Sequence, residues 1–261
     1  MEKQIWNTKI DYLKNTRNHF WNDDYFEFLV KNVWKLNKPI NIIDYGCGYG
    51  FLGIKLLPLL PAGSTYTGVD IGEKLLKDAE QIFRNSPYKT KFIKADITEF
   101  NDTKKYDLAI CQAVLRHIPE YIIVLEKMIK SVVNNGKVIC IEVNRRMENA
   151  GLFIDGQDIN YTEIDKNVNK KWLLELQEGG RDYMTGIKIP VLMEKMGLKN
   201  VGIRVNDFVE FVSPNQNKGK YLEHIDMFFK EHGLSTNHDC NIEISALNAR
   251  SLLISYGIKE V

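Results

Sequence analysis

The chain has 261 residues, of which 44% are hydrophobic and 26% are charged, and such values are ordinary for a soluble globular protein with a full core. The length predicts one elaborated domain, or at most two. Thirty-five Lys and Arg residues against 34 Asp and Glu residues give a formal net charge of +1, so there is no overall attraction to nucleic acid or to an anionic membrane.

Three further classes are disfavoured by local sequence. No apolar run approaches the ~20 residues of a membrane-spanning helix. The first eleven residues mix charged and polar side chains without an apolar stretch, so we expect no secretory signal. The cysteines Cys47, Cys111, Cys140 and Cys240 are widely scattered, which favours free thiols in a cytoplasmic protein over a disulfide framework or a structural zinc site.

The first forty residues predict helices. Apolar residues recur there at steps of three and four, and Asn22 or Asp23 is a candidate helix cap. The segment is also unusually aromatic. The simpler interpretation is a hydrophobic seam that packs on the main domain, and the alternative is an aromatic lid over a ligand.

From residue 41 onward, short apolar strands alternate with helices, which implies βαβ units, a parallel sheet and right-handed crossovers. The residues Asn134, Asn135 and Gly136 predict a turn before the fifth strand. The expected strands cover residues 41–45, 65–69, 90–95, 106–111 and 137–143, and the expected helices cover residues 51–60, 74–85 and 119–133.

After residue 144 the pattern loosens, and we expect an inserted, partly helical segment up to residue 186. Further on, the sequence predicts helices over 187–196 and 218–231, a strand over 201–212 in which a break is left open near Asn206 and Asp207, and a last strand over 251–258. Four segments follow from this division: a helical cap (1–40), an α/β core (41–145), an inserted lid (146–186) and the C-terminal part of the core (187–261).

The most informative motif is a glycine-rich turn that follows the first expected strand. Asp44 precedes Gly46, Gly48 and Gly50, and glycine is needed where a ligand approaches the main chain closely. The spacing is GxGxG rather than the GxGxxG of dinucleotide sites, and a carboxylate at this point would repel a pyrophosphate. It suits a cationic ligand such as S-adenosylmethionine (SAM), which carries a sulfonium and an amino group. Cys47 within the turn is interpreted as a small filler.

Two further carboxylates end the next two strands. Asp70 can accept hydrogen bonds from both ribose hydroxyls of a nucleoside, a feature that NAD enzymes share. Asp96 can accept a hydrogen bond from the adenine amino group, with Ile71 and Ile97 beside the ring. Each carboxylate alone is compatible with a helix cap or a turn, but together with the glycines they favour a binding site.

With these pieces in order, the chain resembles the class I SAM-dependent methyltransferases of the small-molecule type over about residues 40–145. The segment from Asp44 to Gly50 resembles their first motif, while Asp70 and Asp96 match the ribose and adenine carboxylates. Residues 106–119 and 135–142 resemble the motifs of the fourth and fifth strands. The resemblance implies an α/β fold with a Rossmann-like, seven-stranded, mostly parallel sheet, helices on both faces and an antiparallel last strand. It also implies SAM as the methyl donor.

Polar residues at strand ends are candidates for ligand contacts. Gln112 ends the fourth strand and is expected to contact the cofactor. His117 could act as a general base toward the acceptor, or could simply order its loop through a hydrogen bond. Glu142 and Asn144 end the fifth strand and either line an acceptor pocket or solvate the strand end.

The two flanking segments supply the candidates for a lid. Arg181 follows a glycine pair and could bind the acceptor at a mobile gate, although a helix start at Asp182 is the favoured interpretation. In the N-terminal segment, Tyr12, Trp21 and Tyr25 are the aromatic residues most readily placed over SAM or the acceptor, because a sulfonium can lie against an aromatic face.

Departures from known subtypes narrow the acceptor. The fourth strand is not followed by the [DNS]PP[FY] tetrapeptide of adenine and glutamine methylation, and Cys111 lacks the preceding Pro of cytosine enzymes, so we interpret it as buried. No carboxylate cluster suggests a Mg²⁺ site. The prediction is therefore a cytoplasmic SAM-dependent methyltransferase acting on a small molecule, with no metal and no nucleic-acid partner. The sequence carries no indication of oligomeric state, and the alternatives are an NAD-dependent oxidoreductase or a non-catalytic binding module.

Overall fold

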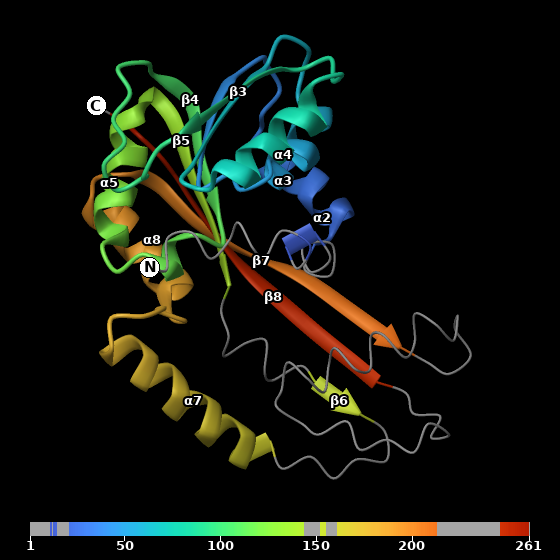
Figure 1. Cartoon of the computed structure of the whole chain (residues 1–261), viewed down its shortest axis with the longest axis vertical. Coiled ribbons are helices and arrows are strands. Elements are labelled where there is room, and N and C mark those ends of the chain that lie inside the picture. Colours follow the sequence, from blue (N-terminus) through green and yellow to red (C-terminus); the bar gives the residue numbers. More distant parts are fainter. Residues whose placement is uncertain are drawn as a thin grey trace.

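The structure of the chain, a computed structural model, describes residues 11, 13–14, 21–143, 152–154, 161–212 and 246–260. Within these ranges, eight strands form one mixed sheet with helices on both faces (Figure 1). Tyr12, Asn144 and the helix predicted over 218–231 lie outside the described residues. In the part of the chain that is described, no helix is long and apolar enough to cross a bilayer.

The strands follow the order β3-β2-β1-β4-β5-β8, and β7 pairs with β8. β1 lies parallel to β2 and β4, whereas β8 runs antiparallel to both β5 and β7. The predicted seven-stranded Rossmann-like sheet with an antiparallel last strand is therefore confirmed, and the short β6 joins β8 as an eighth strand. The strands are β1 Asn41–Tyr45, β2 Thr65–Asp70, β3 Lys89–Lys94, β4 Tyr106–Gln112, β5 Val132–Val143, β6 Leu152–Ile154, β7 Lys199–Val212 and β8 Ala246–Ile258.

Helices α2, α3 and α4 cover one face of the sheet, and α5 and α8 cover the other (Figure 1). Asn22 caps α2, as predicted, because its side chain accepts a hydrogen bond from the Tyr25 N–H at 3.2 Å. The helical elements are α2 Asp23–Phe28 with a π-helix over Leu29–Val33, α3 Phe51–Leu56 with a 3₁₀ turn over Leu57–Leu59, α4 Glu73–Phe83, a 3₁₀ turn over Leu115–His117, α5 Tyr121–Ser131, α7 Tyr161–Gln177 and α8 Thr185–Lys195.

The core has two halves because successive residues of a strand point to opposite faces. In β4, Leu108 and Ile110 pack with the α2–α4 side, whereas Ala109 and Cys111 pack with the α5–α8 side. All four side chains are fully buried. The sheet thus carries apolar residues on both faces, which is the pattern expected of a parallel sheet with helices on each side.

Two predicted helices end earlier than expected. The helix predicted over 51–60 gives way to a 3₁₀ turn at residue 57, because Pro58 lacks the N–H that an α-helix needs. The helix predicted over 119–133 covers only 121–131. Val132 already belongs to β5, where it pairs with Tyr106 of β4, and a β-branched residue suits that position.

The predicted turn at residues 134–136 falls inside the bounds of β5, where the chain bulges and folds back sharply, since a Cβ atom on Gly136 would lie 2.8 Å from the Val133 carbonyl oxygen. Asn135 has a φ of 62°, and its N–H donates to the Lys259 carbonyl at 2.7 Å. The Lys259 N–H donates in return to the Gly136 carbonyl at 3.0 Å. The register between β4 and β5 shifts at this point, so contacts with the chain beyond β8 hold an irregular strand that the sequence suggested as a turn.

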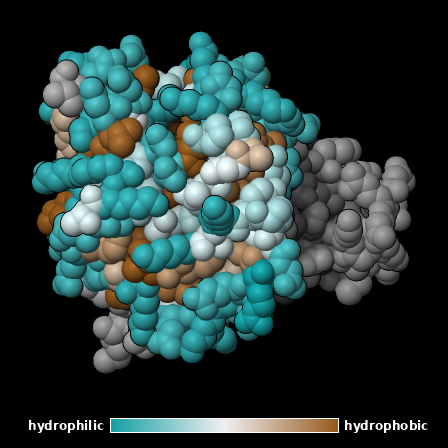
Figure 2. Space-filling view, turned by 90° about the horizontal axis from the view of Figure 1, so that it is seen from above, coloured by the Kyte–Doolittle hydropathy of each residue, from teal (hydrophilic) through white to brown (hydrophobic). Residues whose placement is uncertain are grey.

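The remaining differences concern the C-terminal part of the sheet. α8 begins two residues before the predicted helix and includes Pro190. β7 continues through Asn206 and Asp207 without the break that was left open, and β8 begins at Ala246 rather than at Ser251. The paired ends of β7 and β8 extend past the other strands, on the side where α7 and β6 also lie (Figure 1). Figure 2 shows the molecule from the opposite end, which is mostly hydrophilic with smaller hydrophobic areas between.

Candidate active site

The glycine-rich turn connects β1 to α3 and bends sharply at each glycine. Gly46, Gly48 and Gly50 all have positive φ values, of 75°, 54° and 83°. The N–H groups of Gly46 and Cys47 both donate to the Val69 carbonyl near the end of β2, at 2.8 and 3.1 Å. The turn is therefore fixed against the neighbouring strand, and its glycines are required by backbone conformation.

Gly46 and Gly48 differ in what surrounds them. A Cβ atom on Gly46 would lie 2.6 Å from Val114 Cγ2, so this glycine allows the turn after β4 to pack closely. A Cβ atom on Gly48 would meet nothing within 4 Å. Gly48 also borders a pocket of about 300 Å³, a volume that includes space open to solvent. Gly48 is thus the position where a ligand can come against the main chain.

This pocket lies at the carboxyl ends of β1 and β4, where ligands bind in open α/β sheets. Asp44 and Gln112 reach it from these two strands, and both are buried. Leu13 of the N-terminal segment also borders it and is only 9% exposed. A buried carboxylate, an amide and a bare main chain fit a cationic ligand such as SAM. The remaining lining residues are Gly46, Cys47, Tyr49, Phe51 and Leu52.

Asp44 is held by a tyrosine that the sequence analysis did not single out. The Tyr66 hydroxyl of β2 donates to Asp44 Oδ2 at 2.5 Å, and both side chains are 1% exposed. Burial, and then the nearby Asp44 carboxylate, raise the pKa of Tyr66 well above its ordinary value. The phenol therefore keeps its proton and stays a donor, which fixes the carboxylate at the edge of the pocket. From the sequence, Tyr66 could not be distinguished from the other apolar residues of a buried strand.

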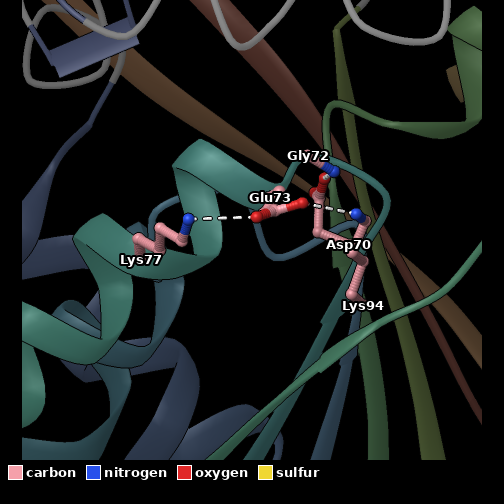
Figure 3. A network of polar contacts seen from close by, with 5 residues as sticks. All are labelled: Asp70, Gly72, Glu73, Lys77 and Lys94. Atoms are coloured by element: carbon pink, nitrogen blue, oxygen red, sulfur yellow. Dashed lines mark hydrogen bonds and ion pairs between the residues drawn. The ribbon is translucent and has the colours of Figure 1, made fainter.

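Asp70 lies at the end of β2, next to Gly72 (Figure 3). It also binds the glycine turn. Its Oδ2 accepts the Gly48 N–H at 2.8 Å, and its Oδ1 accepts the Gly72 N–H at 2.8 Å. Burial raises the pKa of Asp70, although the two backbone hydrogen bonds act in the opposite direction. This carboxylate thus aligns the turn in addition to the ribose contact that was predicted for it.

An exposed ion-pair network flanks Asp70 (Figure 3). Glu73, the first residue of α4, pairs with Lys94 of β3 at 2.5 Å and with Lys77 at 3.0 Å. Hydrogen bonds to Lys94 and Lys77 lower the pKa of Glu73 to about 2. The network joins the start of α4 to the end of β3, next to the loop that carries Ile71.

Asp96 begins the turn that follows β3. Its Oδ1 accepts both the N–H and the hydroxyl of Thr98, at 3.0 and 2.6 Å, which is the turn-capping role that was considered for it. Ile97 is buried against the α5–α8 side of the core, whereas Ile71 is partly exposed. Their contacts with adenine stay a prediction.

His117 lies in the 3₁₀ turn after β4, beside Arg116. The Arg116 Nε–H donates to His117 Nε2 at 3.0 Å, so Nε2 carries its lone pair and the ring is a neutral acceptor in this geometry. Protonation of the ring would bring a second positive charge against the guanidinium. A role as general base therefore requires that the acceptor replace Arg116 at Nε2.

Glu142 lies in β5 with no exposed surface, and it contacts main chain of the turn after β4. Its predicted place at the acceptor side stays a prediction, and Asn144 lies outside the described residues.

Arg181 is bound within a small cluster rather than extended into the pocket. Its Nε donates to Glu175 Oε1 of α7 at 2.5 Å, and its guanidinium lies 5.2 Å from the centre of the Tyr183 ring. Tyr183 also stacks on Trp172 of α7 at 5.2 Å. The adjacent Asp182 accepts the Met184 N–H at 2.9 Å. The helix α8 begins at Thr185, three residues after the predicted start at Asp182.

The aromatic residues of the N-terminal segment pack mainly with one another. Trp21 is 5% exposed and contacts Phe26 and Phe51, with ring centres 4.6 and 5.4 Å apart. Tyr25 is partly exposed and stacks on Phe28 at 5.9 Å. This packing agrees with a hydrophobic seam. The seam still borders the site, because Phe51 lines the pocket, so the lid role stays a prediction.

The three cysteines in the described ranges are buried and free. The Cys47 thiol packs against Gly68, and burial followed by the nearby Asp44 raises its pKa well above the ordinary value. Cys111 faces Cys140 across β4 and β5, and this hydrogen-bonded partner together with burial raises its pKa. Cys111 has no exposed surface, which confirms the prediction that it is buried. The raised pKa values make Cys47 and Cys111 poor nucleophiles.

Comparison with known proteins places the site in context. A family model described as a methyltransferase domain matches residues 36–185, more than half of the chain. The ubiquinone biosynthesis O-methyltransferase of Rickettsia felis is 23% identical over 219 residues, which are 82% of this chain and 83% of that protein. The protein of the same name from Rickettsia akari is 23% identical over 189 residues, or 72% and 68% of the two chains.

Solved methyltransferase structures share the fold at low sequence identity. A phosphoethanolamine N-methyltransferase from Haemonchus contortus, in complex with phosphomonomethylethanolamine and S-adenosylhomocysteine, aligns with a TM-score of 0.59 and 13% identity. That alignment covers 100% of this chain and 59% of the other. The plantazolicin methyltransferase in complex with S-adenosylhomocysteine aligns with a TM-score of 0.52 and 15% identity, over 98% and 89% of the two chains.

Proposed function

Because this chain belongs to the methyltransferase domain family and is a SAM-dependent methyltransferase, we propose that it methylates a hydroxyl oxygen of a small, apolar or aromatic acceptor. The observation that carries the proposal is the pocket at the glycine turn, where Asp44, Gly48 and Gln112 meet. The names of the two Rickettsia relatives support oxygen as the methylated atom. The family membership argues against the alternative of an NAD-dependent oxidoreductase.

The cofactor contacts are proposed from the strand ends. Asp70 would accept hydrogen bonds from the ribose, using the acceptor capacity that its backbone contacts with Gly48, Gly72 and Ile71 leave over. Asp44 and Gln112 would lie beside the cationic part of the ligand, where a buried carboxylate favours positive charge. The adenine would lie near Asp96. The residues proposed to contact SAM are Asp44, Gly46, Cys47, Gly48, Gly50, Asp70, Ile71, Asp96, Ile97 and Gln112.

When bound, SAM supplies a methyl group that is already activated by its sulfonium. The chain's residues then have to orient the acceptor oxygen and keep water out. We place His117 beside that oxygen, where Nε2 would take the hydroxyl proton once the acceptor displaces the Arg116 contact. Trp21, Tyr25 and Tyr12 of the N-terminal segment, together with Arg181 and Asn144, are proposed to close the acceptor side.

The proposal keeps the four segments expected from the sequence. β7 and β8 lie in the same sheet as β1–β5, which supports treating residues 187–261 as part of the core. α7 and β6 belong to the inserted segment 146–186, for which we keep the proposed role of a lid. The three buried free thiols support a reducing, cytoplasmic compartment.

We expect SAM affinity to fall as the pH is lowered. The fall should begin at a higher pH than the ordinary pKa of an aspartate would give. Burial raises the pKa of Asp70, and a protonated carboxyl loses acceptor capacity for the ribose. The folded chain binds this proton more tightly than the unfolded chain, so Asp70 itself makes the apoprotein less stable as pH rises through that range. Acidification therefore weakens binding without unfolding through this group. Dissociation constants measured from pH 8 to pH 5 test this, with Asp70→Asn as the variant whose affinity should stay flat.

The function is tested in two steps. Isothermal titration with SAM, S-adenosylhomocysteine and NADH should give micromolar binding of the first two and none of the third. Methyl transfer from labelled SAM is then measured on a panel of phenols and matched anilines. Transfer to phenols alone supports the proposal, whereas transfer to anilines alone contradicts oxygen as the methylated atom. Binding of SAM without any turnover, across acceptors of both kinds, would favour the non-catalytic module.

A further inference from the structure

A buried carboxylate of β5 is bound to the main chain of a different strand's turn. Glu142 has no exposed surface. Its Oε1 accepts the Val114 N–H at 2.9 Å and the Leu115 N–H at 2.8 Å. These are the first N–H groups of the 3₁₀ turn Leu115–His117, which a helix cap normally satisfies from the adjacent sequence. Here the capping oxygen comes from another strand.

The turn itself leaves the sheet through an unfavourable backbone conformation. Ala113 has a φ of 53°, a left-handed value that is costly for a residue with a Cβ atom. Its N–H donates to the Ile141 carbonyl of β5 at 2.8 Å. The turn therefore donates three hydrogen bonds to two successive residues of β5. The two that Glu142 accepts involve a carboxylate, which makes strong hydrogen bonds.

This turn contacts the glycine turn on one side and the chain just before α8 on the other. The two methyl groups of Val114 lie only 2.6 and 2.7 Å from the position that a Cβ atom on Gly46 would take. Only a glycine at position 46 therefore leaves room for Val114. On the other side, the Asp182 N–H donates to the Arg116 carbonyl at 2.9 Å. One short segment thus lies against the glycine turn and also holds the start of α8.

We propose that Glu142 is a positioning residue that sets the turn after β4 and, through Val114, the glycine turn that receives SAM. Its carboxylate acts through the main chain of the turn. It keeps the Val114 side chain over Gly46 and keeps Arg116 in reach of Asp182. Loss of its charge therefore weakens SAM binding, although Glu142 lies outside the residues that line the pocket. This inference depends on SAM as the donor and is independent of the acceptor's identity.

The test combines amide hydrogen exchange with SAM affinity. Glu142→Gln keeps an acceptor oxygen but removes the charge, and a neutral hydrogen bond is weaker than a charged one. We expect roughly tenfold faster exchange at the Val114 and Leu115 amides, together with a several-fold weaker SAM dissociation constant. Val114→Ala should weaken SAM binding similarly without accelerating exchange at Leu115. In the double variant Glu142→Gln with Val114→Ala, the two losses of SAM affinity should be less than additive, because both substitutions act through the position of the Val114 side chain.

Three outcomes would overturn the proposal: unchanged exchange in Glu142→Gln, faster exchange with unchanged SAM affinity, or full additivity in the double variant. Ile189→Val, in the core on the α5–α8 side, is the control for a general loss of stability and should leave SAM affinity unchanged. If Glu142→Gln does not fold, Val114→Ala decides, since unchanged affinity in that variant removes the proposed link to Gly46.

Discussion

A Gly48→Ala variant should fold and bind SAM between about tenfold and a hundredfold more weakly than the natural chain, because an overpacked methyl group costs about 1–3 kcal/mol. No protein atom lies within 4 Å of the added carbon, so the methyl group would occupy space at the pocket edge. The φ of 54° adds a backbone cost for alanine. Isothermal titration with SAM and thermal unfolding of the apoprotein measure the two effects separately.

Gly46→Ala is the matched control, since it places the same methyl group two residues away. There the new carbon would lie 2.6 Å from Val114 Cγ2, so the protein interior has to move. We expect a clear fall in the unfolding temperature for Gly46→Ala and a smaller one for Gly48→Ala. SAM affinity that is unchanged in Gly48→Ala would show that the cofactor does not approach this part of the turn.

An Asp70→Ala variant should lose at least about tenfold in SAM affinity, since hydrogen bonds to a charged group contribute about 1.5–3 kcal/mol. The sequence alone predicts the loss of the ribose contacts. The structure adds that the N–H groups of Gly48 and Gly72 lose their acceptor, so the turn itself loosens. Asp70→Asn keeps one acceptor oxygen, so its SAM affinity should lie between that of the natural chain and that of Asp70→Ala. Equal affinity in a folded Asp70→Ala protein would contradict the assigned cofactor site.

Much of the core could be predicted because its signals are local. The strand from Asn41 to Tyr45, the glycine turn and the carboxylate at Asp70 follow one another within thirty residues, and each has a recognisable pattern of burial or backbone conformation. The arrangement of their ends at one edge then follows from the topology of a parallel sheet.

The features that the sequence did not predict depend on contacts between residues far apart in the chain. The bulge at Asn135 is held by Lys259, and the early end of α5 reflects pairing of Val132 with Tyr106. Likewise, nothing in the sequence around Glu142 indicates that its carboxylate caps a turn 27 and 28 residues earlier. Polar residues at strand ends can be found by pattern, but what they bind is decided by neighbouring strands.

The position of β8 has a consequence for how the chain matures. β8 lies between β5 and β7 and pairs with both, although it is the last described strand to be synthesised. Until residues 246–258 leave the ribosome, neither β5 nor β7 has this partner, and each presents an unpaired strand edge. Pairing β8 with β5 also closes a loop of more than a hundred residues, and such distant contacts form slowly. During synthesis the chain therefore passes through a stage in which the edges of β5 and β7 are open to pairing with another chain.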